Sequence, residues 1–215
     1  MKSCGAVILI ILFAGCKYVG TPPIKQLPIC GPPEIKRSII NNKEVIDTVC
    51  HTVADFALTN QYGDSVHTAM MDGKVYVANT FNTICSSEGL EKLEQELKKV
   101  QQAYIDTQDF YILSFTVDTK WDTPAQLLAY IKRKGIIDKH RFLLTGQSID
   151  SMHHLIRSYL LQVGVNPDNP RCGFIHDNIV TLIDRHGRIR GFYDLMDSKY
   201  TERLIRDIHT LLNTN

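Results

Sequence analysis

A β-strand that leads through a cysteine into a long amphipathic helix restricts the fold of this chain more than any other feature. The apolar run after Gly73 predicts a buried strand over residues 75–81. Downstream, leucines recur on one face of a helix predicted over residues 88–104, and charged residues occupy its other faces. Cys85 lies between the two elements. A buried strand followed by such a helix predicts an α/β sheet that helices cover.

Strands and helices continue to alternate after this unit. Thr123, Pro124 and Gln126 form an N-terminal capping signature for the next helix, and Ser148 is the expected cap of the one after. The predicted strands cover residues 111–117, 142–144, 179–184 and 188–193, the predicted helices cover residues 124–134, about 149–160 and a final stripe at 204–212, and residues 162–175 are a predicted loop. This order predicts a thioredoxin-like α/β fold with an N-terminal β extension and a C-terminal hairpin plus helix.

Length and charge exclude several classes of protein. The chain has 215 residues, enough for one domain with a sizeable core and a tail. Its net charge is +1 and it has no basic block, so the sequence indicates no nucleic-acid partner.

The N-terminus predicts an exported, lipid-anchored protein. Lys2 is the only charged residue before the apolar run at 6–14, which is typical of a signal peptide and too short to span a bilayer. The small residues before Cys16 resemble a bacterial lipobox, in which that cysteine receives the lipid. We therefore expect a signal peptide over residues 1–15, a lipidated tether over 16–29 and a folded domain over 30–215, anchored outside the cytoplasm.

Export allows disulfides to persist, and it gives the remaining cysteines a context. Short β-like segments are predicted over residues 27–30 and 45–53, and they carry Cys30 and Cys50. These two cysteines are the candidates for a structural disulfide, provided that their Cα atoms lie within about 7 Å.

The position of Cys85 predicts a reactive thiol. The N-terminus of a helix presents unpaired N–H groups and the positive end of the helix dipole, which favour thiolate. Thiolate attacks disulfides and binds soft metals. Gly89, however, stands four residues on, where a second thiol would share the same helix turn.

Three stretches of the chain, in one register, resemble the Sco/SenC family. The first is Val75-Tyr76-Val77-Ala78-Asn79-Thr80-Phe81-Asn82-Thr83-Ile84-Cys85, the second is Ser114-Phe115-Thr116-Val117-Asp118 with Asp122-Thr123-Pro124, and the third is Gly173-Phe174-Ile175-His176 leading into Val180-Thr181-Leu182-Ile183-Asp184. The segment from His51 to Phe56, with Thr59-Asn60-Gln61, is similar to the entry strand of that family. The resemblance covers roughly residues 27 to 212.

The resemblance implies a membrane-tethered thioredoxin-fold protein that binds copper. Family members hold copper through a Cys-x-x-x-Cys pair and a distant histidine, and they help to assemble the copper centre of cytochrome oxidase. Cys85 matches the first cysteine of that motif and His176 matches the histidine, whereas Gly89 falls at the second cysteine and Ser86 replaces the usual proline. The implied site, for Cu(I), is therefore short of one thiolate.

Cys172 is the candidate for the missing sulfur. It lies four residues before His176, in a loop that the resemblance places over Cys85. Cu(I) prefers thiolate and accepts imidazole, so Cys85, His176 and Cys172 form a suitable donor set. The same two cysteines are equally suited to a reversible disulfide.

Three functions follow from these residues. The leading hypothesis is a metallochaperone, not an enzyme, that passes copper to a receiving protein such as an oxidase subunit. The alternatives are an extracytoplasmic thiol–disulfide oxidoreductase that uses Cys85 with Cys172, and a non-catalytic descendant that keeps the fold to bind a partner.

Overall fold

The computed structural model describes residues 26–41, 43–168 and 172–214, and for His176 it describes the backbone alone. The predicted signal peptide and most of the tether, including Cys16, lie outside the described residues. The elements in chain order are β1 (Glu34–Ile40), β2 (Lys43–Val49), β3 (Ala57–Thr59), β4 (Ser65–His67), the 3-10 helix η1 (Thr68–Met71), β5 (Val75–Phe81), α1 (Glu88–Ala103), β6 (Phe110–Thr116), α2 (Pro124–Lys134), β7 (Arg141–Leu144), α3 (Ile149–Ser158), β8 (Val163–Val165), β9 (Phe174–His176), β10 (Ile179–Ile183), β11 (Ile189–Asp194) and α4 (Ser198–Leu212).

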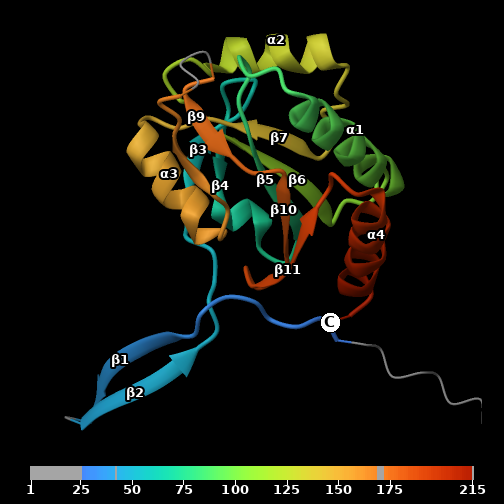
Figure 1. Ribbon diagram of the computed structural model, residues 1–215. Helices are drawn as coiled ribbons and strands as arrows, with labels where there is room; N and C mark the ends of the chain where they lie inside the picture. Colours follow the sequence, from blue (N-terminus) through green and yellow to red (C-terminus); the bar gives the residue numbers. More distant parts are fainter. Residues whose placement is uncertain (1–25, 42, 169–171, 215) are drawn as a thin grey trace, which may run out of the picture.

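A mixed five-stranded sheet forms the centre of the body, in the order β11-β10-β5-β6-β7 (Figure 1). Strands β5, β6 and β7 are parallel, and the C-terminal hairpin β10–β11 joins β5 in antiparallel register. All seven residues of β5 are buried, as the apolar run predicts for a central strand. The thioredoxin-like α/β fold expected from the sequence is confirmed.

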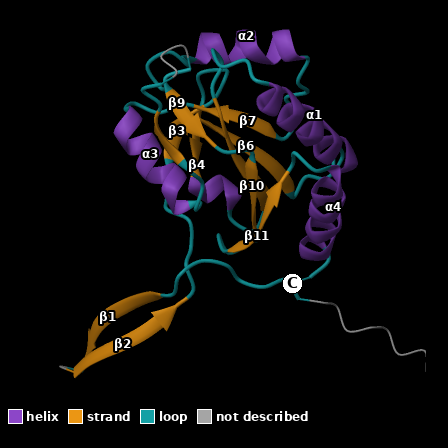
Figure 2. Cartoon of the chain, in the orientation of Figure 1, coloured by secondary structure: helices purple, strands orange, loops and turns teal. Residues whose placement is uncertain are grey.

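Two hydrophobic cores, one on each face of the sheet, hold the body together (Figure 2). The first joins one face of β5 and β6 to the apolar stripes of α1, α2 and α4. The second joins the opposite face to α3 and to the segment around β3 and β4. Adjacent strand residues such as Tyr76 and Val77 belong to different cores, because side chains alternate across a strand.

The helix starts follow their capping residues. The Thr123 hydroxyl accepts a hydrogen bond from the backbone N–H of Gln126 at 3.4 Å, and Gly135 ends α2 in the left-handed conformation with φ 58°. The Ser148 hydroxyl accepts from the backbone N–H of Ser151 at 3.2 Å at the start of α3. Helix α2 therefore has the bounds that the sequence predicts.

The N-terminal region and the segment before β10 differ from the prediction. Residues 27–30 form no strand. They lie along β11, where the Cys30 N–H donates to the carbonyl of Ile189 at 2.8 Å and the Arg190 guanidinium donates to the carbonyl of Pro28 at 2.9 Å. Residues 162–175, predicted as a loop, contain β8 and enter β9, which pair with each other in antiparallel register.

Strands β1 and β2 form a separate antiparallel hairpin that projects from the body (Figure 1). Strand β1 was not predicted from the sequence, because its isoleucines at 35, 39 and 40 do not alternate with polar residues and face no core. The hairpin's aliphatic side chains are exposed, namely Ile35, Ile39, Ile40, Val45 and Ile46.

Candidate functional site

Cys85 lies in the connection between β5 and α1, at the end of the sheet that is uppermost in Figure 1. Its side chain is half buried and packs against the edge of the first core. Helix α1 begins at Glu88, and the Ser87 hydroxyl caps it by accepting from the Leu90 N–H at 3.1 Å. Cys85 therefore precedes the helix cap by two residues, just outside the first turn of the helix.

Cys85 forms a disulfide with Cys172, with the two Cα atoms 4.9 Å apart. Cys172 lies in the turn that enters β9, 87 residues further along the chain. This Cα separation is within the ordinary range for disulfides. Of the two arrangements that the sequence left open for this pair, a shared metal or a disulfide, the structure contains the disulfide.

His176 ends β9, where its backbone pairs with Val163 of β8. The strand places its backbone four residues after Cys172, in the same segment of chain. Its side chain is not among the described atoms. The role of His176 as a copper ligand stays a prediction.

Asn178 occupies the space beside Gly89, where the sequence analysis placed the missing cysteine. A Cβ atom added to Gly89 would lie 3.1 Å from the Asn178 Nδ2 atom and 3.3 Å from its Oδ1 atom. The residue four positions before Cys85 is Phe81, which ends β5 and is buried in the first core. Neither residue four positions from Cys85 therefore carries a sulfur, and the sulfur bonded to Cys85 comes from Cys172.

Asp122 anchors the loop that carries Cys85. Its buried carboxylate accepts hydrogen bonds from the hydroxyls of Thr83 and Thr116 and from the Thr83 N–H at 3.4 Å. Burial raises the pKa of the Asp122 carboxyl, and the hydrogen bonds from the two threonines act against that rise. The contacts of Asp122 are therefore with the site loop, through Thr83, and with the end of β6, through Thr116.

Asn82 and Arg133 hold the same loop from other sides. The Asn82 side chain is fully buried; it accepts from the Ile84 N–H at 2.9 Å and donates to the Cys172 carbonyl at 3.1 Å. The Arg133 guanidinium donates to the Thr83 carbonyl at 3.0 Å. Sequence reasoning missed Asn82, because one of its partners is 90 residues away.

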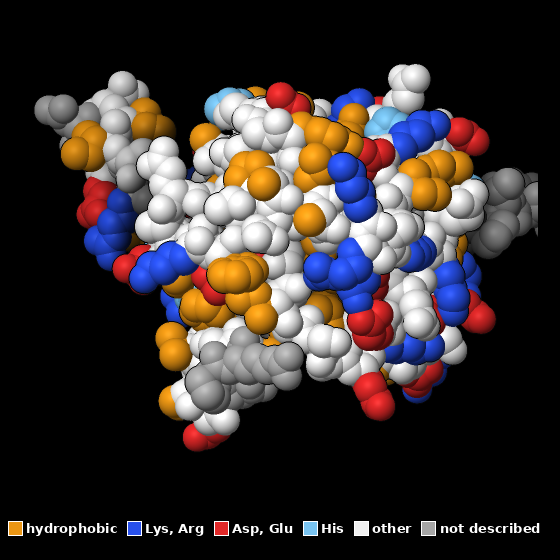
Figure 3. All heavy atoms as spheres, turned by 90° about the horizontal axis from the view of Figure 1, so that it is seen from above, with side chains coloured by type: hydrophobic (Ala, Val, Ile, Leu, Met, Phe, Trp, Pro, Cys, Tyr) orange, Lys and Arg blue, Asp and Glu red, His pale blue; other side chains and the backbone are white. Residues whose placement is uncertain are grey.

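The surroundings of the disulfide are partly apolar. Figure 3 looks onto this end of the molecule and shows hydrophobic side chains exposed among charged ones. Ile84, Trp121 and Ile175 are each more than a third exposed, and they come from the segments next to the disulfide and to Asp122. Access to the sulfurs is therefore bordered by apolar as well as polar surface.

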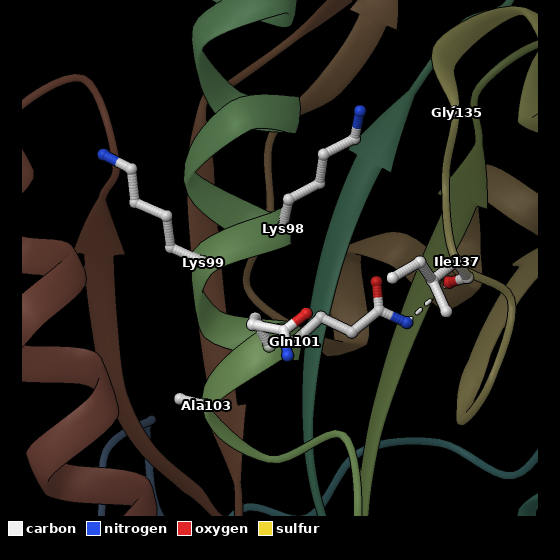
Figure 4. Close-up of a pocket in the computed structure, with 7 residues that line it drawn as sticks. Lys98, Lys99, Gln101, Ala103, Gly135 and Ile137 are labelled. Carbon is white, nitrogen blue, oxygen red and sulfur yellow. Dashed lines mark hydrogen bonds between the residues drawn. The ribbon is translucent and has the colours of Figure 1, made fainter.

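A hollow of about 610 Å³ lies near the C-terminal end of α1, and none of the site residues described above lines it (Figure 4). The Gln101 side chain crosses toward the segment after α2 and donates to the Ile137 carbonyl at 2.6 Å. Lys98 donates to the Lys134 carbonyl, and Lys99 pairs with Glu96 at 2.8 Å, so both cations already have partners. The hollow is lined by Lys98, Lys99, Gln101, Gln102, Ala103, Gly135 and Ile137.

The predicted disulfide between Cys30 and Cys50 is not formed, and both thiols are free. Cys30 is half buried beside β11, whereas the exposed Cys50 follows directly after β2. The β1–β2 register pairs Glu34 with Val49, so its continuation would place Pro33, and not Cys30, opposite Cys50.

The described side chains, which do not include the His176 imidazole, contain no group of three or more His, Cys, Asp or Glu that could hold a metal ion. Within the described ranges, no helix has the length and apolar character needed to cross a membrane.

Sheet order, helix placement and a disulfide at the end of the sheet define a thioredoxin-like protein with a cysteine pair at its site. The chain belongs to the SCO1/SenC family, whose sequence model matches residues 47–213. A search of curated proteins found no match.

Solved structures agree with this assignment. A SCO1/SenC family lipoprotein from Bacillus anthracis is 26% identical, with a TM-score of 0.67 over 75% of this chain and 95% of that one. BsSco, described as a cytochrome c oxidase assembly protein with a disulfide switch, is 21% identical, with a TM-score of 0.67 over 77% of this chain and 95% of its own. Bradyrhizobium japonicum ScoI, solved with copper bound, is 23% identical, with a TM-score of 0.62 over 74% and 99%.

Proposed function

We propose that this protein carries Cu(I) for assembly of the copper centre of cytochrome oxidase, with Cys85, Cys172 and His176 as the copper ligands. The observation that carries the proposal is the Cys85–Cys172 disulfide, because it brings together the two sulfurs that the donor set needs. The copper-bound structure of a family member supports copper as the cargo. The glycine at position 89 then removes no ligand from this donor set, because the second sulfur comes from Cys172.

The chemistry of the donors fits Cu(I). A dithiol reductant would supply the two electrons and two protons that convert the disulfide into two thiols, and would itself be oxidised to a disulfide. Cu(I) would then displace the two protons when it binds the sulfurs as thiolates. Thiolate sulfur is the preferred ligand of this soft ion, and a neutral imidazole from His176 would complete three-coordination. Copper would leave by ligand exchange with a receiving protein, such as an oxidase subunit.

A lipid anchor at Cys16 would suit the placement of the site. The described chain begins at residue 26 at the lower end of the body in Figure 1, and the β5–α1 connection lies at the upper end. A tether on the lower end would leave the disulfide directed away from the membrane. The Bacillus anthracis relative, itself described as a lipoprotein, supports an extracytoplasmic, membrane-anchored location.

Thiol–disulfide exchange is the second candidate function, and the same disulfide favours it. In that reaction a thiolate of a substrate protein attacks one sulfur, forms a mixed disulfide and releases the other sulfur as thiolate. A second thiolate from the substrate then resolves the mixed disulfide, leaving Cys85 and Cys172 reduced and the substrate oxidised. Neither Cys85 nor Cys172 is fully buried, so the pair lies at the surface, where a substrate protein would approach it.

Cu(I) titration of the reduced protein against a competing chelator tests the copper proposal. We expect one Cu(I) per chain, with affinity reduced at least about tenfold by Cys85→Ser, Cys172→Ser or His176→Ala, since each removes a ligand. Cys50→Ser is the matched control, because Cys50 is an exposed free thiol at the base of the hairpin. Wild-type protein that binds no copper above the chelator would contradict the proposal and favour thiol–disulfide exchange.

A further inference from the structure

Asn82 connects the two segments that carry the sulfurs, without involving either sulfur. The residue directly follows β5, and its side chain is fully buried. Its Oδ1 atom accepts from the Ile84 N–H at 2.9 Å, next to Cys85 in the chain, and its Nδ2 atom donates to the Cys172 carbonyl at 3.1 Å. The orientation of the carboxamide is unambiguous, because a backbone N–H only donates and a carbonyl only accepts.

Each segment also has contacts of its own. The Thr83 hydroxyl and N–H bind Asp122, and the Thr83 carbonyl accepts from Arg133, so the Cys85 loop is fixed to the body. On the other side, the Cys172 carbonyl also accepts from the Phe174 N–H at 2.8 Å, within the turn that enters β9. The Asn82 amide therefore adds a cross-link between two locally ordered segments.

We infer that Asn82 is a positioning residue that keeps Cys172 beside Cys85 when the disulfide is reduced. The inference rests on the proposed function only in taking the cysteine pair to be used in its reduced state. With this hydrogen bond in place, the reduced segments stay together, and the effective concentration of one thiol near the other is high. The two sulfurs are then already close together, both for closure of the disulfide and for binding of a soft cation.

A purely local role for Asn82 is the alternative explanation. The hydrogen bond to Ile84 two residues on is an Asx-turn, which would shape the loop even if the bond to Cys172 contributed nothing. The two halves of the carboxamide are separable by substitution. Asn82→Asp keeps an acceptor for the Ile84 N–H but cannot donate to the Cys172 carbonyl, and Asn82→Ser retains a shorter turn-forming acceptor.

The test is the dithiol–disulfide equilibrium of the full chain, titrated with dithiothreitol and its oxidised form. Closure joins the two sulfurs and passes two electrons and two protons to oxidised dithiothreitol. We expect Asn82→Asp to lower the closure equilibrium constant about tenfold, which corresponds to a midpoint potential about 30 mV more positive. Asn82→Ser should change it in the same direction, so the test stands if the Asp variant fails to fold.

Thr83→Val is the control, because it removes a hydroxyl that fixes the same loop to Asp122 without reaching Cys172. An unchanged potential in both Asn82 variants, or an equal change in Thr83→Val, would overturn the inference. Copper binding is read separately. A shifted potential in a protein that does not bind Cu(I) would support the role of Asn82 while contradicting the proposed function.

Discussion

Of the two cysteine pairs of this protein, the pair that is close in the sequence is unbonded, and the pair that is distant in the sequence forms a disulfide. Cys30 and Cys50 are close in the chain, flank a hairpin and remain free thiols. Cys85 and Cys172 are 87 residues apart and form a disulfide. The difference shows that anchoring of the surrounding backbone, and not distance along the chain, decides which sulfurs meet.

The anchors can be named for both pairs. The backbone of Cys30 is held beside β11 by its hydrogen bond to Ile189, whereas Cys50 lies at the base of the projecting hairpin. Cys85 and Cys172, in contrast, lie at the same end of the molecule, on segments that the central sheet and β8–β9 hold in place. The hydrogen bond between Asn82 and Cys172 joins these segments directly.

The largest expected effect is the loss of stability on reduction of the Cys85–Cys172 bond. In the chain-entropy treatment, a disulfide that closes an 87-residue span raises the free energy of the unfolded chain by about 4.6 kcal/mol. Denaturant unfolding of oxidised and reduced wild-type protein should differ by up to that amount, and Cys172→Ser should resemble the reduced form. Equal midpoints in the two redox states would show that the pair is not linked in solution.

A smaller effect is expected where Asn178 fills the space beside Gly89. Alanine in a helix is favoured over glycine by about 0.5–1 kcal/mol, but its Cβ at this position would crowd the Asn178 amide at 3.1 Å. We expect Gly89→Ala to stabilise the protein only in an Asn178→Ala background. A double-mutant cycle on the free energy of unfolding should give a coupling of about 1 kcal/mol, and strict additivity would contradict the contact.

The buried Asp122 predicts a pH-dependent term in the stability of the loop that holds Cys85. Because burial raises its pKa, the folded state binds this proton more tightly than the unfolded state does. Its contribution is complete below the ordinary pKa of 3.8 and is lost as the pH rises through the folded value. The difference in unfolding free energy between wild type and Asp122→Asn should therefore decrease above pH 3.8; a flat difference would refute it.

The smallest effect is expected at the unbonded pair. Cys50→Ser should change the free energy of unfolding by less than about 0.5 kcal/mol, since the exposed thiol has no bond to lose. Maleimide should label Cys50 quickly in both oxidised and reduced protein, and the half-buried Cys30 more slowly. Protection of both thiols under oxidising conditions would mean that they pair after all.

The sequence predicted the body well because its signals are local. The apolar run of β5, the leucine stripe of α1 and the capping residue Thr123 each act within one element. Strand β1 was missed because it faces no core, and the short β8 and β9 were missed because each is defined mainly by the other.

The site was predictable in part. The position of Cys85 between a strand and a helix followed from the local pattern of the sequence. Its pairing with Cys172 was reached through the family resemblance and was left as one of two arrangements. The contacts of Asn82 and Asn178 depend on residues that become neighbours only in the folded chain. Such contacts leave no periodic pattern, so a single sequence does not reveal them.

The contacts at the base of the β1–β2 hairpin hold the two ends of the hairpin together independently of its strands. Gly31 and His51 approach so closely there that a Cβ on Gly31 would lie 2.9 Å from that of His51. The His51 ring binds the Ser158 carbonyl at 2.7 Å, and Arg190 holds the chain before Gly31. Since the segments that enter and leave the hairpin meet at this point, we expect that a short linker in place of residues 34–49 would leave the body folded.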